Sequence, residues 1–186
     1  ESTGGDYYDY LYKGDHAADK IDIAVGDVSD HGIQSALLMA TTRSALHQRW
    51  SRSGSIAHIL SDVNRQLVRD VEESGNFITM FFTEIDKQNS SIRWVNAGHD
   101  PAIIYDPCTD AFDELGGRNI ALGIDTNIKY EELQREIAKG QILVIGTDGI
   151  WESRNIKGEM FGKDKFKEVI KENAGASAKI ILNSVI

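Results

Sequence analysis

Three aspartates stand beside glycine where apolar segments begin or end. Asp6 lies in GGDYYDY, Asp27 ends the run IDIAVGD, and Asp148 follows ILVIGT. The neighbouring glycines let the backbone bend closely around a ligand. Carboxylates that converge on one point repel one another unless cations neutralise them, and oxygen ligands suit Mg²⁺ or Mn²⁺. The pattern therefore indicates a candidate metal site at one edge of a sheet, although each Gly-Asp pair alone is typical of an ordinary turn.

Other polar residues near these loops allow two interpretations each. We interpret Asp30 as the N-cap of a helix and His31 as an early helix residue; the alternative for His31 is a general acid or a metal ligand. His99 lies in a turn, where it either orients substrate or hydrogen-bonds the backbone. Residues 152–162 form either a flap over the site or a solvated connection.

Several other chemistries lack their residues in this chain. Cys108 is the only cysteine, and no arginine follows it before Arg118, so the thiolate loop of a cysteine phosphatase is absent; we interpret Cys108 as a buried or tolerated thiol. No Asp-x-Asp, no G-x-x-x-x-G-K-[ST] and no G-x-S-x-G occurs. Attack by a metal-activated water remains as the chemistry that fits the aspartates.

Length and charge restrict the class of protein further. The 186 residues suit one domain with a buried core. A net charge of −9 argues against a surface that binds nucleic acid or anionic lipid, because both need clustered lysine and arginine. No apolar run is long enough for a membrane span, and no signal peptide is visible. With one cysteine and no intrachain disulfide, we expect a cytoplasmic protein. From the charge, we expect no nucleic-acid partner.

The residue pattern predicts strands on both sides of a pair of helices. Strands are predicted at residues 7–12, 20–28, 77–86, 91–98, 101–105 and 141–149. The first helix is predicted to share one apolar face among Ile33, Ala36, Leu37 and Ala40. The second has Ser55 as its N-cap and a stripe of Ile56, Ile59, Leu60, Val63, Leu67 and Val71. Two further helices are expected after Phe161 and after Gly175. This order favours an α+β fold with antiparallel strands and outer helices.

The ordered motifs resemble a known family from Gly4 to about Gly162. They are similar to the bacterial SpoIIE/RsbU-type branch of the PPM (2C-like) metal-dependent protein serine/threonine phosphatases. The resemblance rests on GGDYYDY, VGDVSDHGIQSALLMA, FITMFFTEID, VNAGHDPAIIY, IALGI and LVIGTDGIWESRNIKGEMFG. It implies two packed antiparallel sheets, a β-sandwich, with helices on both outer faces, and residues 1–186 as a single phosphatase domain.

The resemblance also implies a site with two Mn²⁺ or Mg²⁺ ions. Asp6 matches the family's first metal-site aspartate, and Asp27 matches the bridging one. The Val28 carbonyl is implied as a backbone ligand, and Asp148 as the later aspartate that holds one ion. Catalysis would then proceed through a metal-activated water held by these three aspartates.

For the substrate, the resemblance implies phosphoserine or phosphothreonine on a small STAS-type anti-anti-sigma factor, in bacterial partner-switching control of transcription or stress responses. An N-terminal sensor or receiver domain is expected in the full-length protein. Any homodimer is expected to use the helices of residues 33–74 or a segment before Glu1.

Two segments of the family pattern are missing from this chain. Family members carry a strand before GGD and end with Asp-Asp-x-Thr on a final strand, and this chain stops at Ile186. We expect both segments to lie outside residues 1–186. One alternative is an inactive pseudo-phosphatase that binds such a partner without turning it over, and another is a structural Ca²⁺- or Mg²⁺-binding module.

Overall fold

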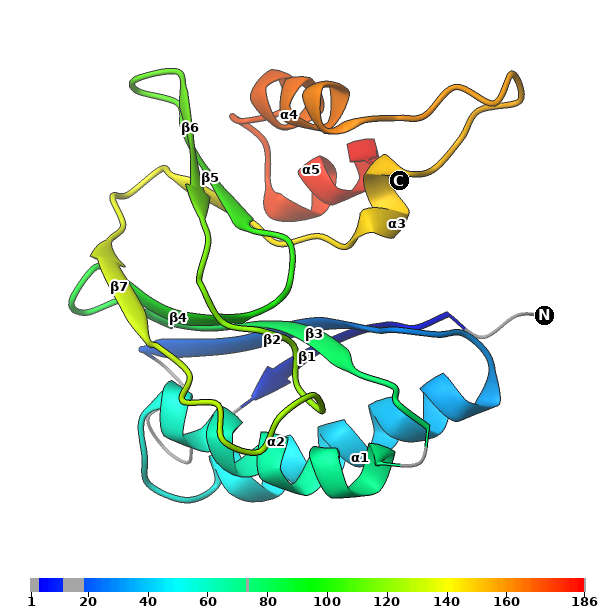
Figure 1. Ribbon diagram of the computed structural model, residues 1–186. Helices are drawn as coiled ribbons and strands as arrows, with labels where there is room; N and C mark the ends of the chain where they lie inside the picture. Colours follow the sequence, from blue (N-terminus) through cyan, green and yellow to red (C-terminus); the bar gives the residue numbers. More distant parts are fainter. Residues whose placement is uncertain (1–3, 12–18, 73, 186) are drawn as a thin grey trace. The chain divides into compact units, whose positions relative to one another are not determined.

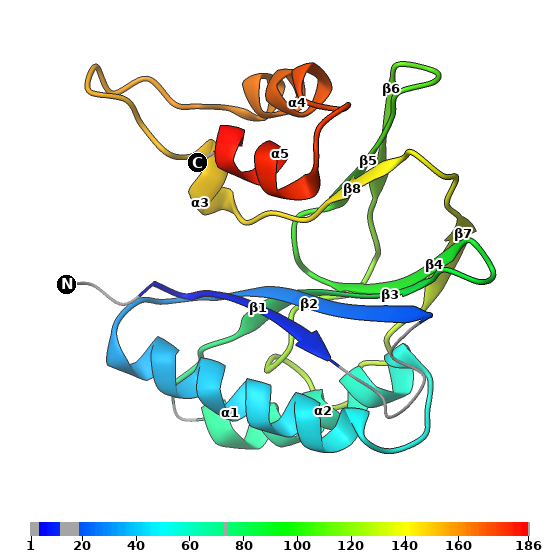
Figure 2. The same ribbon diagram turned by 180° about the vertical axis from the view of Figure 1, so that it is seen from behind.

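The computed structural model describes residues 4–11, 19–72 and 74–185, shown from two sides in Figure 1 and Figure 2. The chain divides into two compact units, of which the first comprises residues 1–101 and 116–137 and the second residues 102–115 and 138–186. Tyr12 and Ile186, which end a predicted strand and a predicted helix, lie outside the described residues. Within the described ranges, no helix is long and apolar enough to cross a membrane.

The first unit contains an antiparallel sheet with the strand order β1-β2-β3-β4-β7. Alternate residues of β2 are buried from Asp22 to Val28, as expected of a strand with one face packed on helices. The strands are β1 (Asp6–Leu11), β2 (Lys20–Val28), β3 (Ile78–Asp86), β4 (Ser91–Ala97) and β7 (Leu133–Glu136). The first four confirm the predicted strands to within a residue, whereas β7 was not predicted.

Two helices, α1 (Ile33–Trp50) and α2 (Ile56–Val71), cover one face of this sheet (Figure 1). The prediction for α2 is confirmed, because Ser55 accepts a hydrogen bond from the His58 N–H at 3.2 Å and the whole predicted stripe is buried. Each buried aliphatic side chain contributes about 1.5–3 kcal/mol relative to its exposed state. The stripe of α2 therefore contributes a large share of the buried apolar surface of this unit.

The prediction for α1 is wrong in two respects. Its N-cap is Gly32, with φ of 94°, whereas Asp30 lies outside the helix and accepts a hydrogen bond from the His31 N–H. The predicted apolar face is turned outward, because Ile33 and Leu37 are 78% and 64% exposed. The buried side instead consists of Ser35, Leu38, Thr42, Ala45, Leu46 and Trp50. Two of these residues carry hydroxyl groups, and Thr42 satisfies its own by donating to the Leu38 carbonyl.

The second unit contains a three-stranded antiparallel sheet, in the order β6-β5-β8, and three helices. Phe166, Ile170 and Ile181 from the helices form a buried cluster with Ile103 and Tyr105 of the sheet. The elements are β5 (Ala102–Asp106), β6 (Ala111–Leu115), β8 (Ile142–Val144), α3 (Asp148–Trp151), α4 (Lys163–Glu172) and α5 (Ala178–Val185). The strand predicted over residues 141–149 is shorter than expected and ends at Val144. Cys108 is exposed in the β5–β6 turn, so of the two interpretations the buried thiol is excluded and the tolerated one is left.

The fold class is confirmed as α+β, with two antiparallel sheets and helices. The strands absent from the prediction, β6 and β7, are short edge strands with several exposed polar residues. Edge strands keep such residues because an apolar free edge would pair with other chains. Their sequences AFDEL and LQRE therefore lack the apolar alternation that identifies a strand.

Candidate metal centre

Asp6 and Asp27 lie directly opposite each other at the end of the β1–β2 ladder. Their Cα atoms are register partners in the antiparallel pair, so the two side chains share one face of the sheet. Directly opposed residues have Cβ atoms about 4.5–5.5 Å apart. This face is the one opposite α1 and α2, because the adjacent residues Tyr7 and Val28 are buried on the helix side. The sequence prediction that these two aspartates come together is supported by this register.

Gly5 brings the chain very close to Asp27. A Cβ atom added at Gly5 would lie 2.8 Å from the Val28 carbonyl oxygen, 2.9 Å from the Asp27 Oδ1 and 3.1 Å from the Asp30 carbonyl oxygen. Any larger residue at this position would have to displace one of these oxygens. The Val28 N–H also donates to the Gly5 carbonyl at 3.2 Å. Gly5 thus permits the Val28 and Asp30 carbonyl oxygens and the Asp27 carboxylate to lie close to the backbone just before Asp6.

The connection between β2 and α1 is held by its own hydrogen bonds. Ser29 and Phe77 bond reciprocally, because the Ser29 N–H donates to the Phe77 carbonyl and the Phe77 N–H donates to the Ser29 hydroxyl, both at 3.0 Å. The Asp30 N–H donates to the Val28 carbonyl at 2.8 Å. His31 is exposed and lies before the helix. The turn therefore fixes the backbone direction of Asp27 and Val28 without using the His31 ring.

Next to Asp27 on the neighbouring strand β3 lies Thr79, which in turn contacts His99. Thr79 is the register partner of Asp27 on β3, and its hydroxyl lies 3.4 Å from the Asp27 carbonyl oxygen and 2.9 Å from the His99 Nδ1. His99 is buried, and its N–H and carbonyl both bond the Asn96 side chain. His99 thus supports the site backbone through Thr79. Thr79 stands in FITMFFTEID, but no sequence signal distinguishes it from its neighbours.

Asp148 belongs to the second unit, where it is exposed and opens α3. Its carbonyl accepts the Glu152 N–H at 2.8 Å, and the preceding Thr147 is buried. The loop of residues 152–162 that follows is exposed and internally bonded, with Asn155 accepting from the backbone N–H of Lys157 and Glu159. The role of Asp148 at the Asp6–Asp27 pair stays a prediction.

The other face of β1 carries an aspartate in a different environment. Asp9 is 14% exposed and accepts from the Tyr7 hydroxyl at 2.9 Å and from Arg43 Nε at 3.0 Å, and it pairs with His47 Nε2. Burial acts to raise the pKa of Asp9, but hydrogen bonds from His47 and Tyr7, together with the charges of His47 and Arg43, hold this pKa below its usual value. Burial and the Asp9 carboxylate raise the pKa of Tyr7 well above its usual value.

The residues of the first unit fit part of a divalent-cation site. Two facing carboxylates and the nearby Val28 carbonyl supply only oxygen, which is the donor set that Mg²⁺ and Mn²⁺ prefer. In the part of the chain that the structure describes, no three acidic, histidine or cysteine side chains form a complete metal cluster. The first unit therefore supplies two carboxylates and one carbonyl of the ligand set that such a cation would need.

Solved structures show which class of fold this is. The chain is similar to the SiaA-PP2C domain of Pseudomonas aeruginosa, with a TM-score of 0.82 at 21% identity over 98% of this chain and 71% of that chain. It is also similar to RsbX in complex with magnesium, with a TM-score of 0.68 at 17% identity over 98% of this chain and 78% of that one. The fold is thus that of PP2C-type phosphatase domains.

The sequence comparison identifies the family. The family of stage II sporulation protein E (SpoIIE) matches residues 17–186, and the chain belongs to this family. It is also 27% identical to the phosphoserine phosphatase RsbU of Bacillus subtilis over 185 residues, which cover all of this chain and 53% of RsbU. The chain therefore spans about half the length of that relative.

Proposed function

We propose that this chain is a metal-dependent phosphatase domain that hydrolyses phosphoserine or phosphothreonine on a protein. The observation that carries the proposal is the facing pair of Asp6 and Asp27 beside the Val28 carbonyl, in a chain of the SpoIIE family. RsbU, a relative of this family, is itself a phosphoserine phosphatase. Residues 1–186 are proposed to act as a single phosphatase domain.

The roles of the residues follow from their donor atoms. Asp27, with the Val28 carbonyl beside it, would hold two Mn²⁺ or Mg²⁺ ions in common; Asp6 would complete one of them, and Asp148 would supply the third carboxylate. When bound, such ions lower the pKa of a shared water and offset the charge of the phosphate. RsbX, a structural relative, was solved in complex with magnesium. Thr79 and Ser29 would keep the Asp27 backbone in place, because Thr79 bonds the Asp27 carbonyl and Ser29 bonds Phe77 close by.

The reaction proposed is a direct hydrolysis without an enzyme-bound phosphate. A water oxygen forms a bond to phosphorus, the bond from phosphorus to the serine or threonine oxygen breaks, and this oxygen gains the proton that the water loses. The carboxylates alone would repel a phosphate, so the acidic site needs cations to accept this substrate. The exposed Cys108 takes no part.

The partners proposed are those expected for the family. The substrate would be a phosphorylated STAS-type anti-anti-sigma factor in a partner-switching pathway, and the full-length protein would carry a sensor or receiver domain. A homodimer and a cytoplasmic location also remain proposals.

The test is the release of phosphate from a phosphorylated STAS-type protein by the full-length protein, after its metals have been removed on a chelating resin. We expect no release without metal and a return of activity when Mn²⁺ is added. Binding of the phosphorylated protein without release at any Mn²⁺ or Mg²⁺ concentration would instead identify a pseudo-phosphatase. Calorimetry that detects no divalent-ion binding would reject the metal site itself.

A further inference from the structure

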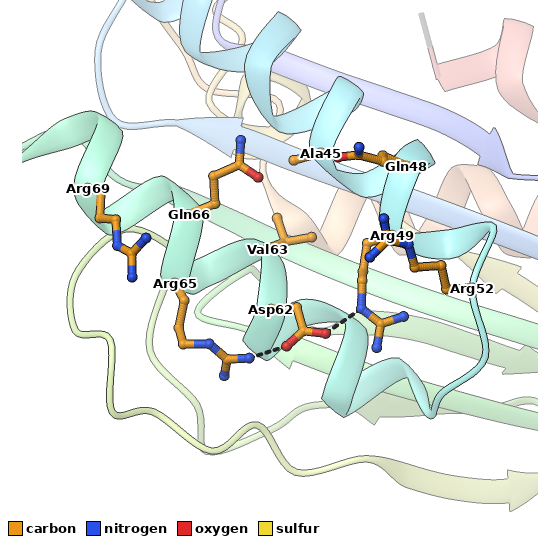
Figure 3. A pocket seen from close by; sticks show the side chains of 9 residues that line it. All are labelled: Ala45, Gln48, Arg49, Arg52, Asp62, Val63, Arg65, Gln66 and Arg69. Carbon is orange, nitrogen blue, oxygen red and sulfur yellow. Dashed lines mark hydrogen bonds and ion pairs between the residues drawn. The ribbon is translucent and has the colours of Figure 1, made fainter.

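A groove lies between α1 and α2 within the first unit, away from the Asp6–Asp27 pair. Its cavity of about 490 Å³ is bounded by the end of α1, the turn after it and the middle of α2. Figure 3 shows four arginines around it, and the only acidic side chain of the lining is Asp62. Ala45 and Val63 form a small apolar part of the lining, and two glutamines supply neutral hydrogen-bonding groups. The arginines are Arg49 and Arg52 after or on α1, and Arg65 and Arg69 on α2.

The positive charge of this groove contrasts with the charge of the whole chain. Four guanidinium groups against one carboxylate leave a surplus of three positive charges in a chain whose net charge is −9. Four of the nine arginines of the chain line this one groove, and no lysine occurs between Lys20 and Lys87. Arginine differs from lysine in offering a planar fork that binds phosphate or carboxylate oxygens in pairs.

Asp62 orders part of this cluster without neutralising it. Its carboxylate accepts from Arg49 Nε and from Arg65, and Arg49 also donates to the Ser53 carbonyl at 3.1 Å. Burial acts to raise the pKa of Asp62, but the hydrogen bond from Arg49 and the charges of Arg49, Arg65 and His58 hold it below its usual value. Arg49 is 14% exposed, so its guanidinium is well fixed.

The two outer arginines, Arg52 and Arg69, are exposed, and among the described residues neither forms an ion pair with a carboxylate. They stand on opposite sides of the groove, with the Arg49–Asp62–Arg65 cluster between them (Figure 3). A ligand that bridges them would contact both helices and meet fixed guanidinium groups in the middle.

We propose that this groove binds a compact polyphosphate anion, in which two or three linked phosphate groups meet the four arginines. Two or three linked phosphate groups carry about three to four negative charges in a small volume, which matches the surplus of positive charge in the groove. The cavity lies within the range of about 300–1,000 Å³ typical of small-molecule sites. An acidic peptide needs several residues to carry the same charge and would extend beyond the cavity. A free polyphosphate and a nucleoside triphosphate present the same oxygens, and the test below distinguishes the two sources.

The test measures binding by calorimetry at low salt, with the full chain freed of metals on a chelating resin. The probes are tripolyphosphate, ATP and a peptide of eight glutamates. We expect tripolyphosphate to bind, and binding to weaken as salt rises because the contacts are charged. Equal affinity for ATP and tripolyphosphate identifies the phosphate chain as the ligand, whereas tighter binding of ATP identifies a nucleotide. Because neither metal nor hydrolysis enters this measurement, its outcome is independent of the proposed phosphatase activity.

Arg52→Gln and Arg69→Gln test the groove without breaking the Asp62 cluster. Each is expected to weaken tripolyphosphate binding about threefold, and the double variant about tenfold, as for charge pairs at a protein surface. Arg118→Gln removes an exposed arginine outside the groove and is expected to change nothing. Asp62→Asn is expected to tighten binding, because it removes the only negative charge of the lining. Absence of tripolyphosphate binding, equal binding by the double variant and the parent chain, or tighter binding of the glutamate peptide would each overturn the proposal.

Discussion

Asp6 and Asp9 lie on the same strand, on opposite faces, in opposite environments. Asp9 points toward α1 and is bound by Arg43, His47 and the Tyr7 hydroxyl. Asp6 is exposed at the start of the strand, and its register partner is another aspartate, Asp27. Asp9 is thus contacted by cationic side chains of α1, whereas Asp6 lies opposite a second carboxylate.

The difference shows how one strand can serve stability and chemistry together. A carboxylate that is held by its own cations contributes to the folded state, and its lowered pKa records that interaction. Two directly opposed carboxylates repel each other in a sheet, and a bound cation offsets this repulsion. We therefore assign Asp9 to the fold and Asp6 with Asp27 to the proposed site. Substitutions on the two faces should change different quantities.

The largest effect is expected for Asp27→Asn. This change keeps the shape of the side chain but removes the charge that would bind both ions. Loss of an outer-shell partner costs roughly 10- to 100-fold in activity, so loss of this ligand should cost about a thousandfold. Without metal, the variant should be as stable as the parent chain or more stable by about 0.5 kcal/mol, because an opposed like charge is removed. Phosphate release and thermal unfolding measure the two effects.

Asp70→Asn is the matched control for this change, since Asp70 is an exposed aspartate on α2. It should alter neither quantity. Unchanged phosphate release by Asp27→Asn would remove Asp27 from the proposed site, and a large loss of stability would make Asp27 a structural residue like Asp9.

The second effect is expected for Asp9→Asn, and it concerns stability. Because the variant loses the charge that Arg43 and His47 contact, its free energy of unfolding at neutral pH should fall by about 2 kcal/mol. The pKa of Asp9 is lower in the folded chain than in the unfolded chain, so its contribution is present above the usual value of about 3.9. As the pH falls through the lowered folded pKa, this contribution is lost, and the two chains should converge.

Urea unfolding at a series of pH values measures this convergence. The release of phosphate at saturating Mn²⁺ should remain near that of the parent chain while Asp9→Asn is folded. A stability difference that persists unchanged in acid would show that packing, and not charge, explains the loss. In the same series, Asp70→Asn should have the same free energy of unfolding as the parent chain at every pH.

Helices and strands were predictable from the sequence where burial imposes an apolar pattern. The candidate site was predictable only in the part that lies where strands begin or end. The stripe of α2 is confirmed because apolar side chains such as Ile59 and Leu67 have no favourable alternative to burial. The pairing of Asp6 and Asp27 was predictable because each flanks an apolar strand beside glycine.

The features that could not be predicted depend on tertiary contacts. Ser35 and Thr42 of α1 are buried, while the more apolar Ile33 and Leu37 are exposed. No local pattern shows which side of a helix with small residues all round will face a sheet. The arginines of the groove are likewise spread over two helices and the turn between them. Thr79 acquires its place only from the register of β2 and β3.

The smallest effect is expected for Thr79→Val. This change tests whether the site extends from Asp6 and Asp27 to their neighbour on β3. The hydroxyl of Thr79 connects the His99 ring to the Asp27 carbonyl, so its loss should loosen the backbone that presents Asp27 and Val28. Thr79 is a positioning residue, and we expect the Mn²⁺ concentration for half-maximal activity to rise about tenfold while kcat at saturating Mn²⁺ stays within about twofold. Thr83→Val removes a hydroxyl from the same strand that bonds the Arg93 carbonyl. This control should lower stability without changing the Mn²⁺ requirement, and an equal shift in both variants would place the effect in the sheet as a whole.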